Sequence, residues 1–124
     1  MSTDYSKMSD QEINMAIARM FFPDDIVIES RSRPPSACIT CSPSRWVDYC
    51  NNPADAWPII HYNRISIVSL DNKWLAAPTE TVIDGVTGDS EVCFYASSDA
   101  VFDVNPLRAA MVVFLMMQGY KNAS

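Results

Sequence analysis

The strongest constraint on this chain is an apolar run close to its C-terminal end. Every residue between Arg108 and Gln118 is apolar. Asn105 and Pro106 stand in front of the run, a capping side chain followed by a proline suited to the first helical position. A helix that is apolar on all sides is buried, because no face of it favours water. We therefore predict a buried helix over 107–117, ended by Gly119 as a C-cap and covered by the chain itself or, on one face, by a second subunit.

An N-terminal helix is predicted from its capping signals. Ser9 and Glu12 have the spacing of a capping box, in which each side chain bonds to the other residue's backbone amide. The segment Pro23-Asp24-Asp25 ends the helix. The apolar residues that fall on one face of this helix are Ile13, Ala16, Ile17 and Met20.

The remaining regular elements are short. Apolar and β-branched runs predict strands at about 26–29, 65–70, 73–77 and 91–96, with Asp71-Asn72 as the turn between the second and the third. Asn52 followed by Pro53 predicts a helix start, and Pro58 should limit that helix to one or two turns. The fold class is therefore α+β: a single small domain over 1–124, with an antiparallel sheet packed against the N-terminal helix and the buried C-terminal helix.

The segment 30–45, SRSRPPSACITCSPSR, differs in character from the rest of the chain. It is rich in Ser and Pro and carries Arg31, Arg33 and Arg45 without an acidic residue. Prolines at three positions oppose a regular helix or a central strand. We predict a Ser/Pro/Cys-rich surface loop here.

Composition and charge narrow the class of partner. A chain of 124 residues, 48% of them hydrophobic, is the size and type of one globular domain. The net charge of −6 opposes general binding to nucleic acid phosphates or to an anionic membrane. The disfavoured alternative is a local contact with nucleic acid. In it, Arg31, Arg33 and Arg45 would contact the backbone, and Trp46 and Tyr49 would stack on a base. No apolar run reaches the roughly 18 residues of a membrane span, and the polar residues at the start do not resemble a secretory signal, so we expect a cytoplasmic protein.

Four cysteines raise the question of a metal. Cys38 and Cys41 have the C-x-x-C spacing of a zinc knuckle, which Cys50 and Cys93 could complete. A structural zinc site usually shows two such knuckles, and Cys93 lies in an apolar run where a thiol simply packs. We expect reduced, free thiols, with no metal and no cofactor; a small zinc-binding regulator is the alternative.

Catalysis is not expected. The chain has one histidine, His61, and three glycines, and it lacks the phosphate-binding loops and nucleophile motifs that need closely spaced glycines. A single histidine at the end of a helix is most simply a surface residue. We predict a protein that is not an enzyme.

The candidate binding residues are clustered in the middle of the chain, with one addition from the last helix. Polar amides, a carboxylate and an indole lie within a few residues, and together with Trp46 and Arg108 they are candidates for a small pocket. An arginine in the first turn of an otherwise apolar helix is disfavoured by the helix dipole, so we expect it to pair with an acid, either Asp55 or Asp103. The alternative is that its side chain points to water. The predicted binding residues are Asn51, Asn52, Asp55, Trp57 and Arg108.

Three stretches of the sequence resemble a known family. YSKMSDQEIN, CNNPADAWPII and NPLRAAMVVFLMM are similar to the NinX-like family of small proteins of lambdoid phages and enterobacterial prophages. The resemblance implies a phage or prophage product made in the bacterial host, and it carries no catalytic residues over to this chain. The expected function is a non-catalytic accessory protein that binds a host or phage protein, with a homodimer through the C-terminal helix as a further expectation.

Overall fold

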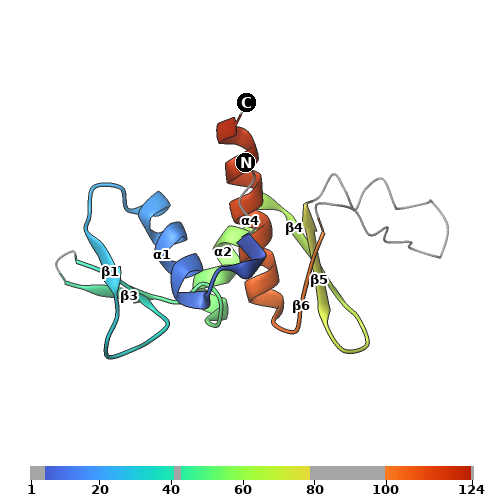
Figure 1. Cartoon of the computed structure of the whole chain (residues 1–124), viewed down its shortest axis with the longest axis horizontal. Coiled ribbons are helices and arrows are strands. Elements are labelled where there is room, and N and C mark those ends of the chain that lie inside the picture. The colour runs from blue at the N-terminus through green and yellow to red at the C-terminus, as the bar shows by residue number, and fades with distance from the viewer. Residues whose placement is uncertain (1–4, 41–42, 79–99, 124) are drawn as a thin grey trace.

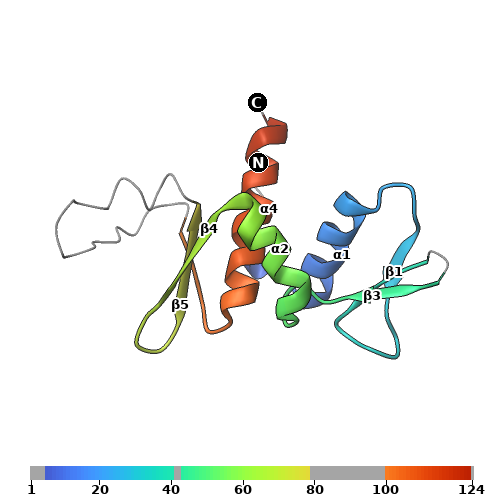
Figure 2. The same ribbon diagram turned by 180° about the vertical axis from the view of Figure 1, so that it is seen from behind.

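The computed structural model describes residues 5–40, 43–78 and 100–123, with the side chains of the last helix described as far as residue 119. Helix α4 (Pro106–Ala123) stands near the middle of the molecule, with helices α1 (Asp10–Phe21) and α2 (Pro53–Asn63) beside it (Figures 1 and 2). A small antiparallel sheet lies at each end. The predicted α+β fold class is confirmed.

Helix α4 is the centre of the core. The side chains from Ala109 to Leu115 are all buried, as the apolar run predicts, and the chain's own elements cover them. Helices α1 and α2 contact α4 on one side, and the strands β4 to β6 contact it on the other. Asn105 caps the helix, because its Oδ1 accepts hydrogen bonds from the amides of Leu107 (2.9 Å) and Arg108 (3.3 Å). Among the described residues, no helix combines the length and apolarity needed to cross a membrane.

The sheet beside α4 contains strands β4 (Ile65–Ser69), β5 (Trp74–Pro78) and β6 (Val101–Asp103), in that order and antiparallel. The first two form the predicted hairpin, and the amide of Leu70 bonds to the Lys73 carbonyl across the turn (2.8 Å). The third strand was not predicted, and the strand expected at 91–96 lies outside the described residues.

The second sheet corrects two predictions. Strand β1 (Val27–Glu29) does not join the β4–β5 hairpin. It pairs with β2 (Ala37–Ile39), which pairs with β3 (Arg45–Val47). The segment 30–45 is thus not only a surface loop. Ala37 and Ile39 alternate with polar or half-buried neighbours and turn inward onto α1, while the prolines lie in the connections, where a missing N–H costs no ladder bond.

The two flanking helices begin as predicted. Ser9 and Glu12 form the capping box of α1, and Asn52 caps α2 with Pro53 in the first turn. On α1, Ile13 and Ile17 are buried as expected, but Met20 is substantially exposed.

The predicted end of α2 at Pro58 is wrong. The helix continues through the proline to Asn63 and ends at Arg64, whose backbone is left-handed (φ 54°). Pro58 removes one intrahelical hydrogen bond, but burial of Ala56, Ile59 and Ile60 against the core supports the helix on both sides of it.

Gly119 is not the C-cap of the last helix, which runs on to Ala123. A Cβ atom at this position would lie 2.7 Å from the Tyr5 hydroxyl oxygen. The glycine therefore serves close packing of the N-terminal 3-10 turn η1 (Tyr5–Lys7) on α4 rather than helix termination.

We predict that Phe114→Ala lowers the free energy of unfolding by roughly 3–5 kcal/mol, because its buried ring stacks on Phe21 in the centre of the molecule. Urea denaturation followed by far-UV circular dichroism measures the change. The matched control is Phe102→Ala, on the more exposed β6 ring, for which we expect a loss below about 1 kcal/mol. A similar small loss for Phe114→Ala would show that α4 is not the core.

Candidate functional site

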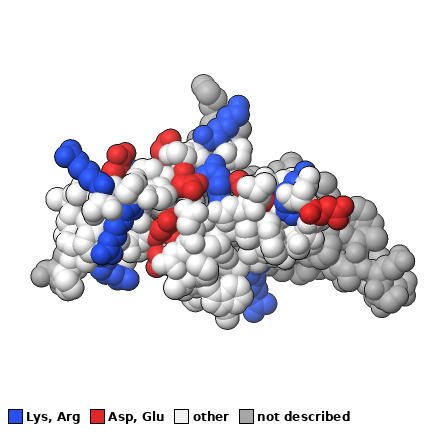
Figure 3. All heavy atoms as spheres, turned by 90° about the horizontal axis from the view of Figure 1, so that it is seen from below, with Lys and Arg blue, Asp and Glu red and all other residues white. Residues whose placement is uncertain are grey.

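Charge is unevenly spread over the molecule. On the face shown in Figure 3, acidic side chains gather around the middle, while long basic side chains lie over the end formed by β1 to β3. That end carries Arg31, Arg33 and Arg45, and the guanidinium of Arg33 lies over the Trp46 ring at 4.4 Å. The middle of the molecule is where most of the predicted binding residues fall.

Arg108 is held inside the protein by four hydrogen bonds. Its Nε contacts Asp103 Oδ2 (3.1 Å) and its Nη1 contacts Asp10 Oδ1 (2.6 Å), while Nη2 donates to the carbonyls of Ser6 (3.0 Å) and Met8 (2.5 Å). The predicted pairing with Asp103 is confirmed and the pairing with Asp55 is wrong. Arg108 therefore ties the N-terminal segment to the start of α4, and its guanidinium is largely occupied.

Asn51 belongs to the same polar network as Arg108. Its Nδ2 donates to Asp10 Oδ2 (3.2 Å) and to both carboxylate oxygens of Asp48, and its Oδ1 accepts from Asn105 (3.2 Å). Two predicted binding residues are thus brought together through Asp10, which sequence reasoning did not select. The network joins elements of the fold to one another.

The other three predicted residues lie apart from this network. The Asn52 side chain caps α2 at the Ala54 amide (3.0 Å), and Asp55 Oδ2 accepts from the Asp48 amide (3.0 Å). Trp57 is 61% exposed, with its ring edge-to-face against His61. The indoles of residues 46 and 57 and the guanidinium of Arg108 therefore do not form the small pocket suggested by the sequence.

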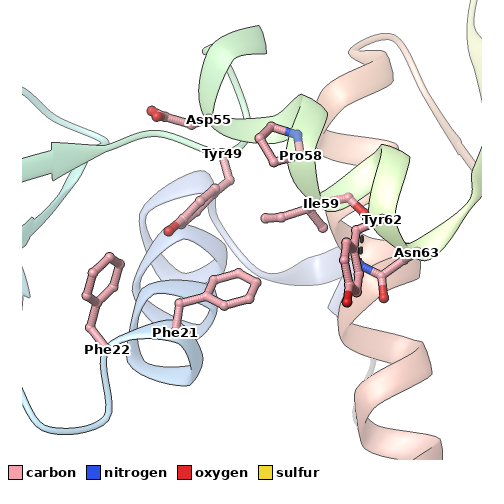
Figure 4. Close-up of a pocket in the computed structure, with 8 residues that line it drawn as sticks. All are labelled: Phe21, Phe22, Tyr49, Asp55, Pro58, Ile59, Tyr62 and Asn63. Carbon is pink, nitrogen blue, oxygen red and sulfur yellow. Dashed lines mark hydrogen bonds between the residues drawn. The ribbon is translucent and has the colours of Figure 1, made fainter.

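A hollow lies between the end of α1 and helix α2 (Figure 4). We call it the aromatic groove. Its volume is about 420 Å³, within the range of roughly 300–1,000 Å³ typical of ligand pockets. Two large rings on its rim are unusually open to water: Tyr62 is 91% exposed and Phe21 48% exposed. The lining residues are Phe21, Phe22, Tyr49, Asp55, Pro58, Ile59, Tyr62 and Asn63.

The position of Tyr49 in this groove is set by a buried amide on α1. Asn14 is 0% exposed, and its Oδ1 accepts from the backbone amides of Tyr49 (2.8 Å) and Cys50 (3.2 Å). Its Nδ2 donates to the Pro35 carbonyl (3.0 Å) and to Asp48 Oδ1 (2.9 Å). The Tyr49 ring also packs near Phe21, with centroids 6.3 Å apart. The groove wall is therefore built on a fully satisfied buried polar group, which holds it rigidly.

The hydroxyl of Tyr49 is the unusual polar atom of the groove. Tyr49 is only 5% exposed, yet its hydroxyl has no hydrogen-bond partner among the described residues. No side-chain polar atom in the described part of the chain is both sealed from solvent and unpaired, so this hydroxyl reaches water through the groove. Burial, with a contribution from the Asp55 charge, raises the pKa of Tyr49 to about 12, opposed by Arg45. The hydroxyl is thus a neutral donor at physiological pH.

The cysteines provide no metal site in the described ranges. Cys38 lies half-buried in β2, and Cys50 is fully buried beside the polar network. Burial raises the pKa of the Cys50 thiol, and the Asp10 charge acts in the same direction. Within residues 5–40, 43–78 and 100–123 no group of three or more His, Cys, Asp or Glu side chains could hold a metal ion. Cys41 and Cys93, and with them the C-x-x-C prediction, lie outside the described residues.

His61 is exposed on α2 and its described contact is the Trp57 ring, at a centroid distance of 5.9 Å. It does not line the aromatic groove. No carboxylate or thiol of the described residues is hydrogen-bonded to it.

Sequence reasoning found one lining residue of the groove, Asp55, and missed its aromatic walls. In the sequence, Phe21 and Phe22 continue the apolar face of a helix. Tyr49 and Tyr62 follow them only after the three strands β1 to β3, so the sequence does not indicate that the four rings lie together. An available signal was the pair of adjacent phenylalanines before Pro23, since neighbouring positions of a helix do not face the same side.

We predict that Arg108→Ala and Arg108→Lys both destabilise the protein. Removing the guanidinium leaves two partly buried carboxylates and two carbonyls without their donor, a loss of roughly 2–4 kcal/mol. A lysine ammonium is a point charge and cannot reach acceptors on three sides, so we expect it to recover less than half of that loss. Urea denaturation measures both changes, with exposed Arg31→Ala as the control. Full stability in Arg108→Lys would contradict the described network.

A second prediction concerns alkaline pH. The folded protein keeps the Tyr49 proton up to about pH 12, whereas the unfolded chain releases it from its ordinary value of 10.0. The stabilising contribution is therefore complete below pH 10 and is lost as pH rises to 12, a fall of roughly 2–3 kcal/mol in the free energy of unfolding. Urea denaturation near pH 9 and near pH 11.5 should show a larger fall in the wild type than in Tyr49→Phe. Equal falls in the two proteins would refute it.

Comparison with known proteins identifies one relationship. A family model described as "Bacteriophage P22, NinX" matches residues 4–118, which is nearly the whole chain. No curated protein and no solved structure matches.

Proposed function

The chain belongs to the Bacteriophage P22 NinX family, and from that premise we propose that this phage accessory protein is non-catalytic and acts by binding a segment of another protein in its aromatic groove. The partner is a host or phage protein met in the bacterial cytoplasm. The observation that carries the proposal is the pair of open aromatic rings, Phe21 and Tyr62, on the rim of an apolar hollow.

The balance of polar and apolar groups supports binding rather than catalysis. Aromatic rings, a proline and an isoleucine make up most of the lining, and its polar members are a carboxylate, an amide and the tyrosine hydroxyls. Exposed aromatic side chains around a hollow are the usual anchors of protein interfaces, where they supply large contact areas at a small entropy cost. A buried acid–base pair with a nucleophile is what an active site would add, and the groove lining contains neither His nor Cys nor Ser.

Self-association through α4 and nucleic acid binding receive less support. The chain itself buries Ala109 to Leu115, so the middle of α4 offers little apolar surface to a second copy. On the basic end of the molecule, the Arg33 guanidinium already covers a face of Trp46, the ring that would otherwise stack on a base.

Site-specific photo-crosslinking tests the proposal. We expect a protein with p-benzoylphenylalanine in place of Tyr62 to form one discrete heavier adduct in infected bacteria, because residue 62 lies on the rim of the groove. Denaturing gel electrophoresis and mass spectrometry of the adduct measure this.

The matched control carries the same crosslinker at Trp57, which is exposed on the same helix but does not line the groove. We expect no corresponding adduct from residue 57. The same adducts from both positions, or none from residue 62, would exclude the groove as the binding surface.

A further inference from the structure

The aromatic groove carries an unused hydrogen-bond donor. The Tyr49 side chain is buried on the α1 side, and its hydroxyl has no partner among the described residues. Figure 4 shows this hydroxyl pointing into the space beside Phe21 and Phe22. The Tyr49 hydroxyl contacts water only through the apolar groove, so a ligand that fills the groove removes this hydration. The hydroxyl regains a hydrogen bond only if the ligand supplies an acceptor.

The opposite wall carries an unused acceptor. Asn63, at the end of α2, donates its Nδ2 to the Ile59 carbonyl (2.8 Å), which fixes the orientation of its side chain. Its Oδ1 has no hydrogen bond within the described residues. In Figure 4 the Tyr49 hydroxyl and the Asn63 amide lie toward opposite ends of the groove, with Ile59 and the Phe21 ring between them.

A donor and an acceptor on either side of an apolar floor match the chemistry of a peptide. A peptide main chain presents carbonyl oxygens and amide hydrogens at intervals, and its side chains supply apolar surface. A hydrocarbon or lipid tail would fill the floor but leave both polar groups without partners. Asp55 and Arg45 stand near the Tyr49 side with opposite charges, so the rim does not select strongly for either sign of ligand charge.

Resting on the proposed function, we infer that the groove recognises a peptide segment of the partner through one bulky apolar side chain seated between Phe21 and Ile59. A main-chain carbonyl oxygen of the same segment accepts a hydrogen bond from the Tyr49 hydroxyl. The Asn63 side-chain oxygen accepts from a main-chain amide further along the segment. Tyr49 is thus a specificity-determining residue, which distinguishes a peptide from a purely apolar ligand.

Nuclear magnetic resonance titration of the full chain tests the inference with defined probes. The peptide-like probes are N-acetyl-phenylalanine-N-methylamide and N-acetyl-leucine-N-methylamide; toluene is the probe without an acceptor. We expect the capped residues to shift resonances of the groove residues. Tyr49→Phe, which removes only the hydroxyl, should weaken their binding about fivefold to tenfold and leave toluene binding unchanged.

Two controls separate recognition from folding. Tyr62→Phe removes a hydroxyl from the exposed rim and should change the affinity for the capped residues less than twofold, since water already satisfies that group. Tyr49→Phe should keep its melting temperature at neutral pH. A marked loss of melting temperature would mean that the hydroxyl has an internal partner, and would overturn the inference.

The remaining outcomes distinguish this inference from the proposed function. Equal binding of the capped residues to wild type and Tyr49→Phe would refute recognition by the hydroxyl while leaving the groove as a binding site. Toluene binding as tight as the capped residues would point to a small apolar ligand and overturn the peptide assignment. Absence of groove shifts with both capped residues would also overturn it, and the adduct from residue 62 would then decide the proposed function independently.

Discussion

The fold around the groove depends on one buried amide, Asn14. It lies on α1 without solvent contact and bonds to two other parts of the chain: the Pro35 carbonyl, and the 48–50 segment through the Asp48 carboxylate and the amides of residues 49 and 50. All four bonds are made within the protein, so burial leaves no polar atom of this side chain unpaired. The same amide joins α1 to the β1–β2 connection at Pro35 and to the segment before α2 at residues 48–50. It therefore also fixes the position of Tyr49 in the groove wall.

A second polar cluster, centred on Arg108, joins the N-terminal segment and α1 to the start of α4. Arg108 reaches Asp10 at the start of α1, Asp103 at the end of β6 and two carbonyls of the N-terminal segment. The two clusters meet through Asp48 and Asn51, since Asn51 contacts both Asp48 and Asp10. The apolar helix α4 supplies an unbroken run of buried side chains from Ala109 to Leu115, and apolar burial is not directional. The polar groups set the angles at which the surrounding elements pack against it.

This division explains why four of the five predicted binding residues, all except the exposed Trp57, have hydrogen-bond partners within the protein. Asn51 and Arg108 are polar residues next to the core. The sequence alone does not distinguish a polar residue that binds a ligand from one that bonds to another part of the protein. The groove, in contrast, is lined by aromatic residues that in the sequence look like ordinary core. Phe21 serves both purposes, since one part of its ring stacks on Phe114 and nearly half of the side chain remains open. Only the packing of α1 against α2 separates these roles.

Local signals in the sequence were sufficient for the elements with a local cause. Interactions within a few residues explain the capping box at Ser9, the helix starts at Asn52-Pro53 and Asn105-Pro106, and the β4–β5 hairpin. The burial of α4 follows from an apolar run that has no polar face. The predictions for Pro58, Gly119 and the 30–45 segment were wrong because the structure at each depends on residues far away in the sequence. Helix α2 continues through Pro58 because Ile59 is buried in the core, and Gly119 packs closely on Tyr5. Strand β2 forms within 30–45 because Ile39 is buried against α1. The sequence by itself determined the fold class, the helix starts and the phage family. Only the tertiary structure decided which polar groups are satisfied internally and which aromatic rings remain open, because both depend on contacts between residues far apart in the chain.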